Sequence, residues 1–270
     1  IFSCSTIYSM RILQFFCTVD PSLGKVDTAS LPQHTRMELL MSEITLNKER
    51  ICGPAENPKD ITEWDETYFD EDGNITQIMY AGNSLAGSLP LCWLPSTLRR
   101  VFFSGNQLSG SLDLTGLPES LALLKLAANS FGGSIDLRYL PETLEVLNLG
   151  ENTLVGTIDL EHLPDVMQEL YLYTNEFSGN VCLTSLPKKM TYLDISENQL
   201  SGPIDVRYLP SGMEELFLND NEFVGLTDFS HLPTSLTWLD VQNTQLSGTL
   251  EKGEGVSYMA ENSGVKLVEW

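Results

Sequence analysis

The sequence predicts an elongated solenoid in which short parallel β-strands stack once per repeat, closed by a separate cap at each end. Three observations predict this fold. A 23-residue pattern recurs without insertion or deletion, every copy holds a short run of alternating apolar residues that are mostly leucine, and nearly every copy carries an asparagine and a glycine at fixed places. A constant period of this size is typical of proteins whose repeats each pack only against their neighbours.

Leu-Pro pairs open seven of the copies, at Leu94, Leu117, Leu140, Leu163, Leu186, Leu209 and Leu232. An eighth copy begins at Glu71 and keeps the spacing without the Leu-Pro pair. We call each copy a coil and number them from one, at Glu71, to eight, at Leu232. In coil four the spacing LxxLxL places Leu144, Leu147 and Leu149 so that the last part alternates as a strand does, with apolar side chains inward.

The fixed asparagine and glycine predict how one coil joins the next. Seven coils carry the asparagine, namely Asn83, Asn106, Asn129, Asn152, Asn175, Asn198 and Asn221. An amide side chain both donates and accepts hydrogen bonds, so we expect a ladder that ties the turn of one coil to the next. A glycine follows in all eight coils, at Gly87, Gly110, Gly133, Gly156, Gly179, Gly202, Gly225 and Gly248. We expect it to permit a bend that a Cβ atom would crowd.

The pattern LxxLxLxxNxLxG resembles the leucine-rich-repeat family over residues 71 to about 250. Its second half is similar to the plant-type and protist variants, and the Leu-Pro opening is closest to repeats of kinetoplastids and other protists, although Ile-Asp-Leu mostly stands where the plant pattern has Ile-Pro. The resemblance implies an α/β repeat fold, a right-handed solenoid with a parallel β-sheet on its concave face. It also implies short strands and turns on the convex face and a helical N-terminal cap.

The two ends lack the period and are predicted to be caps. Residues 1–70 are expected to form two short helices, Met10–Cys17 and Arg36–Leu46, and an edge strand. The side chains expected to cover the first coil are Ile12, Phe15, Phe16, Leu39, Leu40 and Ile44. Asp72-Gly73-Asn74 predicts a hairpin turn between the edge strand and the first repeat strand.

The repeats are expected over residues 71–254, and residues 255–270 are expected to close the other end as a degenerate ninth coil. The apolar side chains available for that closure are Val256, Tyr258, Val265, Leu267 and Trp270. An uncapped end would expose the core of the solenoid.

The cysteines and the N-terminus favour an intracellular chain over the alternative of a secreted or cell-surface protein. Five cysteines is an odd number, and they form no CxxC motif. A pairing of Cys17 with Cys52 stays open, whereas secreted plant-type caps carry a paired cysteine where this chain has Phe69. The first 16 residues are too short and too polar to cross a bilayer and precede no clear signal-peptide cleavage site. Ile1 is not an initiator residue, so the chain is processed, truncated or incompletely known.

No catalytic residue, cofactor or metal site is predicted. The chain holds three histidines, of which His34 is isolated and His162 and His231 occupy a repeat position that Tyr139 and Tyr208 fill in other coils. A second column consists of aspartates, Asp113, Asp136, Asp159, Asp205 and Asp228. We expect each of them to accept from a nearby turn N–H or to face water. The alternative is a row of cation ligands, although calcium requires six to eight oxygens.

The predicted binding residues lie at outward strand positions of coils five to eight. They are Tyr171, Tyr173, Tyr192, Asp194, Glu215, Phe217, Trp238 and Asp240, and Glu169, Glu197 and Asp220 surround them. Aromatic side chains are enriched at protein interfaces, and carboxylates beside them select a basic or arginine-containing partner. The alternative is that the aromatic side chains only cover one another.

A net charge of −22 would repel nucleic acid and anionic membranes. The sequence therefore predicts a non-enzymatic module for protein–protein interaction or scaffolding, which binds a basic protein segment within a larger hetero-complex. The alternative is a secreted or cell-surface leucine-rich-repeat protein of the receptor type.

Overall fold

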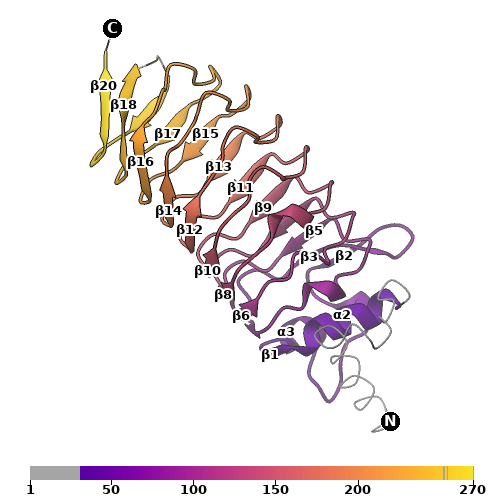
Figure 1. The fold of residues 1–270 in the computed structure, drawn as a ribbon. Helices are drawn as coiled ribbons and strands as arrows, with labels where there is room; N and C mark the ends of the chain where they lie inside the picture. The colour runs from indigo at the N-terminus through magenta and orange to yellow at the C-terminus, as the bar shows by residue number, and fades with distance from the viewer. Residues whose placement is uncertain (1–30, 252, 254, 270) are drawn as a thin grey trace, which may run out of the picture.

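The computed structural model describes residues 31–251, 253 and 255–269, and it is a solenoid made of two long sheets. Figure 1 shows the cap helices at one end and β20 at the other. The first sheet, on the concave face, has the order β2 (Thr67–Phe69), β3 (Ile75–Met79), β5 (Arg100–Phe102), β7 (Leu123–Lys125), β9 (Val146–Asn148), β11 (Glu169–Tyr171), β13 (Tyr192–Asp194), β15 (Glu215–Phe217), β17 (Trp238–Asp240) and β19 (Ser257–Met259).

The second sheet faces the convex side and is also ten-stranded. Its order is β1 (Ile44–Leu46), β4 (Ala86–Gly87), β6 (Gln107–Ser111), β8 (Ser130–Gly133), β10 (Thr153–Gly156), β12 (Glu176–Asn180), β14 (Gln199–Gly202), β16 (Glu222–Leu226), β18 (Gln245–Glu251) and β20 (Gly264–Val268). All pairings are parallel except those at the N-terminal edge, where β2 runs antiparallel to β3 and β1 antiparallel to β4.

The period of the sequence sets the register of the first sheet. Leu147 pairs with Leu170, and Leu170 pairs with Leu193, each 23 residues further along the chain. These leucines are fully buried, so a slip of one residue would move the whole apolar column to the solvent side. The predicted solenoid of parallel strands is confirmed.

The asparagine ladder is also confirmed over six coils. In coil four, Asn152 Oδ1 accepts a hydrogen bond from the Phe131 N–H of the preceding coil at 3.0 Å. Its Nδ2 donates to the Leu126 carbonyl of that coil at 3.2 Å and to the Leu149 carbonyl of its own coil at 3.0 Å. The equivalent bonds recur at Asn106, Asn129, Asn175, Asn198 and Asn221. Asn83 departs because no repeat precedes it, and it donates to the Ala81 carbonyl instead.

The bend after the asparagine is formed as predicted, because all eight glycines have φ between 79° and 154°. Gly87 has a second role at the N-terminal end. A Cβ atom there would lie 2.1 Å from the Glu43 carbonyl oxygen, so only glycine lets the cap backbone approach coil one this closely.

The N-terminal cap differs from the prediction in one respect. The helix expected over Arg36–Leu46 is α2, Gln33–Ser42, and Ile44–Leu46 forms β1 instead. By pairing with β4 this short segment gives its backbone groups hydrogen-bond partners in the second sheet, and the Ser88 N–H donates to the Glu43 carbonyl beside that pairing. Leu39, Leu40 and Ile44 are buried against coil one as expected. The expected helix Met10–Cys17, with Ile12, Phe15 and Phe16, lies outside the described residues.

The cap continues through α3 (Glu49–Cys52) and the 3₁₀ helix η2 (Ile61–Glu63) into the hairpin β2–β3. The predicted hairpin is confirmed, with the Asp70 carboxylate accepting from the N–H groups of Asp72 and Asn74 at 3.0 and 2.8 Å. Two more 3₁₀ helices, η3 (Leu91–Trp93) and η4 (Leu137–Tyr139), lie between coils on the convex side.

A ninth coil closes the C-terminal end. β19 extends the first sheet and β20 extends the second, each in parallel register with coil eight. Val265 is buried and Tyr258 packs against the core, whereas Leu267 is 38% exposed and does not contribute to the closure. Val265 and Leu267 point to the same side of β20, and of the two only Val265 lies among the buried core side chains. Trp270 lies outside the described residues.

Candidate functional site

The first sheet of coils five to eight displays a compact group of aromatic and acidic side chains on its outer surface. Each strand there has a fully buried leucine at its centre, namely Leu170, Leu193, Leu216 and Leu239. Strand alternation therefore turns the residues on either side of each leucine outward. We call these eight outward residues the concave patch, which consists of Glu169, Tyr171, Tyr192, Asp194, Glu215, Phe217, Trp238 and Asp240.

Aromatic and acidic residues alternate in the concave patch both along the strands and across them. Along β11 the order is acid then aromatic, on β13 it is reversed, and β15 and β17 repeat the two orders. Across the strands, Glu169 pairs with Tyr192 and Tyr171 pairs with Asp194. The same inversion holds between β13 and β15 and between β15 and β17. The concave patch is therefore a checkerboard in which the nearest neighbours of every aromatic side chain include carboxylates.

The four aromatic residues alternate between the two outward positions of successive strands, and their rings contact one another. We call the rings of Tyr171, Tyr192, Phe217 and Trp238 the aromatic ridge. The ring centroids of Tyr171 and Tyr192 are 4.4 Å apart, those of Tyr192 and Phe217 5.5 Å, and those of Phe217 and Trp238 6.2 Å. The interplanar angles are 31°, 38° and 29°, which keeps the rings in one tilted stack. The rings do cover one another, as the alternative interpretation expects, yet Trp238 remains 37% exposed and the other three rings are half-buried.

The carboxylates fall into two rows, in each of which they alternate with aromatic residues. Glu169 and Glu215 precede the buried leucines of their strands, whereas Asp194 and Asp240 follow theirs. Members of one row are two coils apart. Within the described residues, no lysine or arginine forms an ion pair with any of the four.

Burial shifts the pKa values of several groups in the concave patch. It raises the pKa of Asp194, although the Ser196 N–H and hydroxyl oppose this by donating to the Asp194 carboxylate at 3.0 and 2.6 Å. Burial likewise raises the pKa of Asp240. The Tyr171 hydroxyl donates to the Glu169 carboxylate at 2.9 Å. Burial is the main cause that raises the pKa of this hydroxyl, and the hydrogen bond to Glu169 raises it further. The patch is thus a desolvated acidic surface whose unfavourable charge a cation would relieve.

The structure brings together seven of the eight residues predicted to bind a partner. The exception is Tyr173, whose ring lies over Gly150 in the preceding coil and whose hydroxyl donates to Glu151 at 3.2 Å. It makes no ring contact with the aromatic ridge within the described residues. Glu169 belongs to the patch but was not among the eight, although the strict alternation of acid and aromatic along β11 identifies it. Glu197 and Asp220 lie in turns beside the patch, at φ near 51° and 53°.

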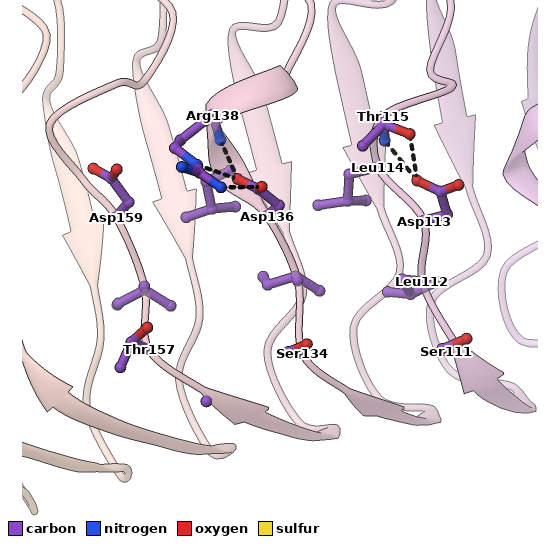
Figure 2. A pocket seen from close by; sticks show the side chains of 14 residues that line it. Ser111, Leu112, Asp113, Leu114, Thr115, Ser134, Asp136, Arg138, Thr157 and Asp159 are labelled. Carbon is purple, nitrogen blue, oxygen red and sulfur yellow. Dashed lines mark hydrogen bonds and ion pairs between the residues drawn. The ribbon is translucent and has the colours of Figure 1, made fainter.

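The convex side carries an open groove of about 920 Å³ over coils two to four. Figure 2 shows Asp113, Asp136 and Asp159 along it, one per coil. Each carboxylate accepts from the N–H two residues further on, at 2.9 to 3.0 Å, which confirms the predicted role in the turns. Asp136 also pairs with the Arg138 guanidinium at 2.7 Å, which holds the pKa of its carboxyl at about 2.

The other two aspartates of this column, Asp205 and Asp228, make the same turn bonds. His162 contacts Asp159 at 2.9 Å, and His231 contacts Ser230 at 2.8 Å. In the part of the chain that the structure describes, no three His, Cys, Asp or Glu side chains converge in a way that could hold a metal ion.

The cysteines do not pair in the way the sequence left open. Cys52 and Cys182 are free thiols, so Cys17 and Cys52 are not paired. Cys92, in η3, is disulfide-bonded. No helix of the described residues is long and apolar enough to span a membrane.

No family model matches the sequence, and no curated protein matches it either. Solved structures match the fold at low sequence identity. A plant ice-binding protein has a TM-score of 0.61 at 20% identity, with 86% of each chain covered. The plant peptide hormone receptor RGFR1, in complex with RGF2, has a TM-score of 0.53 at 23% identity, over 71% of this chain. The PEPR1–AtPEP1 structure has a TM-score of 0.52 at 20% identity, over 87% of this chain.

These likenesses show the fold, which is that of the leucine-rich-repeat solenoids. This chain spans 40% and 42% of the lengths of the RGFR1 and PEPR1 chains. The prediction of an intracellular chain is contradicted, because the fold is shared with receptors such as RGFR1 that bind peptide hormones. The disulfide at Cys92 agrees with this correction, since disulfides persist in oxidising compartments. The sequence did not indicate this disulfide, because Phe69 stands where secreted plant-type caps carry a paired cysteine and the bonded cysteine of this chain lies in η3 instead.

Proposed function

We propose that the chain is a secreted or cell-surface recognition protein of the receptor type, which binds a basic peptide or protein segment on the concave patch and catalyses no reaction. The observation that carries this proposal is the checkerboard of β11 to β17. It combines exposed aromatic surface with four carboxylates that have no basic partner among the described residues. Such a surface offers hydrophobic contact, cation–π contact and charge complementarity at once.

Two finer assignments belong with this proposal. We assign the repeats to the plant-type or protist subclass, because the Leu-Pro opening and the second-half pattern recur in nearly every coil. The partner forms a hetero-complex with this chain, since its basic side chains would neutralise the burial cost of Asp194 and Asp240. The fold shared with peptide-bound receptors supports the receptor reading over the scaffold reading.

A peptide-display selection tests the proposal on the full chain. A random library displayed on phage is selected against the wild-type protein, and the enriched peptides are expected to carry net positive charge. They are expected to lose binding to the triple variant Tyr171→Ala, Tyr192→Ala, Trp238→Ala. Phe102→Ala is the matched control, because Phe102 also faces outward from the first sheet but lies in coil two.

The control variant is expected to bind the enriched peptides as the wild type does, and circular dichroism should show that both variants keep the strand signal. Enriched peptides without a basic bias, or binding that survives the triple substitution, would contradict the proposal.

A further inference from the structure

We propose that the occupant of the concave patch is a basic peptide in the polyproline II conformation, lying along the solenoid axis with cationic side chains at three-residue intervals. This inference rests on the proposed function and names the conformation and spacing of its partner.

The aromatic ridge defines the direction of the occupant. Its rings follow one another from coil five to coil eight at 4.4 to 6.2 Å, so the continuous apolar surface runs across the strands and parallel to the solenoid axis. A peptide that follows the ridge crosses one strand about every 4.8 Å. Prolines dock well on aromatic-lined surfaces in the polyproline II conformation, which is preformed and loses little entropy on binding.

The carboxylate rows define the period of the occupant. Glu169 and Glu215 occupy the same outward position two coils apart, and so do Asp194 and Asp240 at the other outward position. Two strand spacings correspond to about 9.6 Å. One turn of polyproline II has three residues and advances about 9.3 Å. Cations at positions i and i+3 of such a peptide therefore meet both carboxylates of one row.

The threefold shape of polyproline II separates the cationic edge of the peptide from its apolar edges. With cations at every third residue, the cationic side chains share one edge and face one carboxylate row, while the prolines on the other edges contact the aromatic ridge.

Other peptide conformations fit less well. A β-strand places side chains of one face about 6.6 to 6.8 Å apart, so its period departs from the rows by about 3 Å at the first repeat. An α-helix returns to the same face after seven residues, about 10.5 Å along its axis. Its diameter of about 10 to 12 Å also brings only one line of side chains to the ridge at a time.

The test measures binding of fluorescently labelled peptides to the full chain by anisotropy at physiological salt. The first peptide contains four Pro-Pro-Arg units. The second replaces every proline with glycine, which keeps the cation spacing but removes the polyproline II preference. The third contains four Pro-Arg units, which keeps the charge but changes the period to two. The fourth is an alanine-rich helical peptide with four arginines spaced seven residues apart. The Pro-Pro-Arg peptide is expected to bind at least tenfold more tightly than each of the others.

Two double variants test the rows. Glu169→Gln with Glu215→Gln removes one row, and Asp194→Asn with Asp240→Asn removes the other. Because the arginines share one edge of the peptide, one of these two variants is expected to weaken the Pro-Pro-Arg peptide at least tenfold, and tenfold weakening by neither would overturn the inference. The control is Glu176→Gln with Glu222→Gln, a pair that is exposed and also two coils apart but lies on the second sheet. This control is expected to change affinity less than twofold.

The outcomes separate the inference from the function on which it rests. Equal affinity for the four peptides, with all of them weakened by the row variants, would overturn the period-three conformation and leave the basic-segment function standing. Tightest binding by the helical peptide would do the same. A third outcome is that none of the four peptides binds, although the display selection yields basic peptides that bind the wild type and not the triple variant. The polyproline II inference then fails and the proposed function stands. If the selection fails as well, both fail.

Discussion

Asn152→Ala tests the central physical claim about the fold, that the asparagine ladder holds neighbouring coils together. Asn152 is buried, and its side chain joins coil four to coil three through hydrogen bonds with Phe131 N–H and the Leu126 carbonyl. It also donates to the Leu149 and Gly150 carbonyls at 3.0 and 3.1 Å within its own turn. Alanine keeps the backbone and removes all four bonds.

The expected cost follows from these bonds. Loss of the partner of the buried Phe131 N–H costs about 1 to 3 kcal/mol, and the carbonyls add about 1 kcal/mol because an acceptor with two lone pairs tolerates a missing donor better. We therefore expect the free energy of unfolding to fall by about 2 to 4 kcal/mol. Asn83→Ala is the matched control. It holds the same repeat position but is only half-buried and bonds to the Ala81 carbonyl at 3.2 Å, so it should cost less than about 1 kcal/mol.

Urea unfolding followed by circular dichroism measures both variants, with m-values compared to detect a loss of cooperativity between coils. Amide hydrogen exchange adds a local measurement, since the Phe131 amide should lose protection in Asn152→Ala. If the two variants lower the free energy of unfolding equally, or if the Phe131 amide keeps its protection, the asparagine ladder does not hold neighbouring coils together.

Three further predictions follow from single positions. Gly87→Ala should lower the free energy of unfolding by about 2 to 4 kcal/mol, because its Cβ atom would collide with the Glu43 carbonyl. Gly133 also has a positive φ, but a Cβ atom there would meet nothing closer than 3.6 Å, so Gly133→Ala should lower it by only about 1 to 2 kcal/mol. Urea unfolding measures both variants. Thr174→Asn should raise stability by about 0.5 to 1 kcal/mol, since a β-branched residue is strained at φ 50° and asparagine already occupies this repeat position at Asn243; an unchanged urea midpoint would contradict this. Asp194→Asn should raise the stability of the free protein at pH 7, because burial raises the pKa of the Asp194 carboxyl, and the difference should shrink as the pH falls through that raised pKa, while the substitution weakens binding of basic peptides.

The repeat made most of the fold predictable. The spacing of Leu147, Asn152 and Gly156 specifies a strand, a ladder bond and a bend, and these local roles are the same in every coil because each coil packs against a near copy of itself. The cap has no such constraint. There, pairing with β4 turned Ile44–Leu46 into a strand although the local sequence favoured a continued helix. The outward strand positions predicted seven of the eight residues of the concave patch, but not the contacts between the four rings, which depend on how the side chains of neighbouring strands lean together.

Aspartates on the two faces affect stability in opposite directions, and this contrast separates residues that build the fold from residues that we propose to bind a partner. Arg138 and the turn N–H lower the pKa of Asp136 to about 2, so its stabilising contribution is present above the unfolded pKa of 3.8 and is lost as the pH falls towards 2.

Asp194 behaves in the opposite way. Burial raises its pKa above 3.8, so the folded state binds more protons than the unfolded state between the two values, and stability falls as the pH rises through that window. At neutral pH the free protein therefore carries a desolvated charge that weakens it. A partner cation against Asp194 would remove that penalty, so the same burial that destabilises the free solenoid increases its preference for a basic ligand.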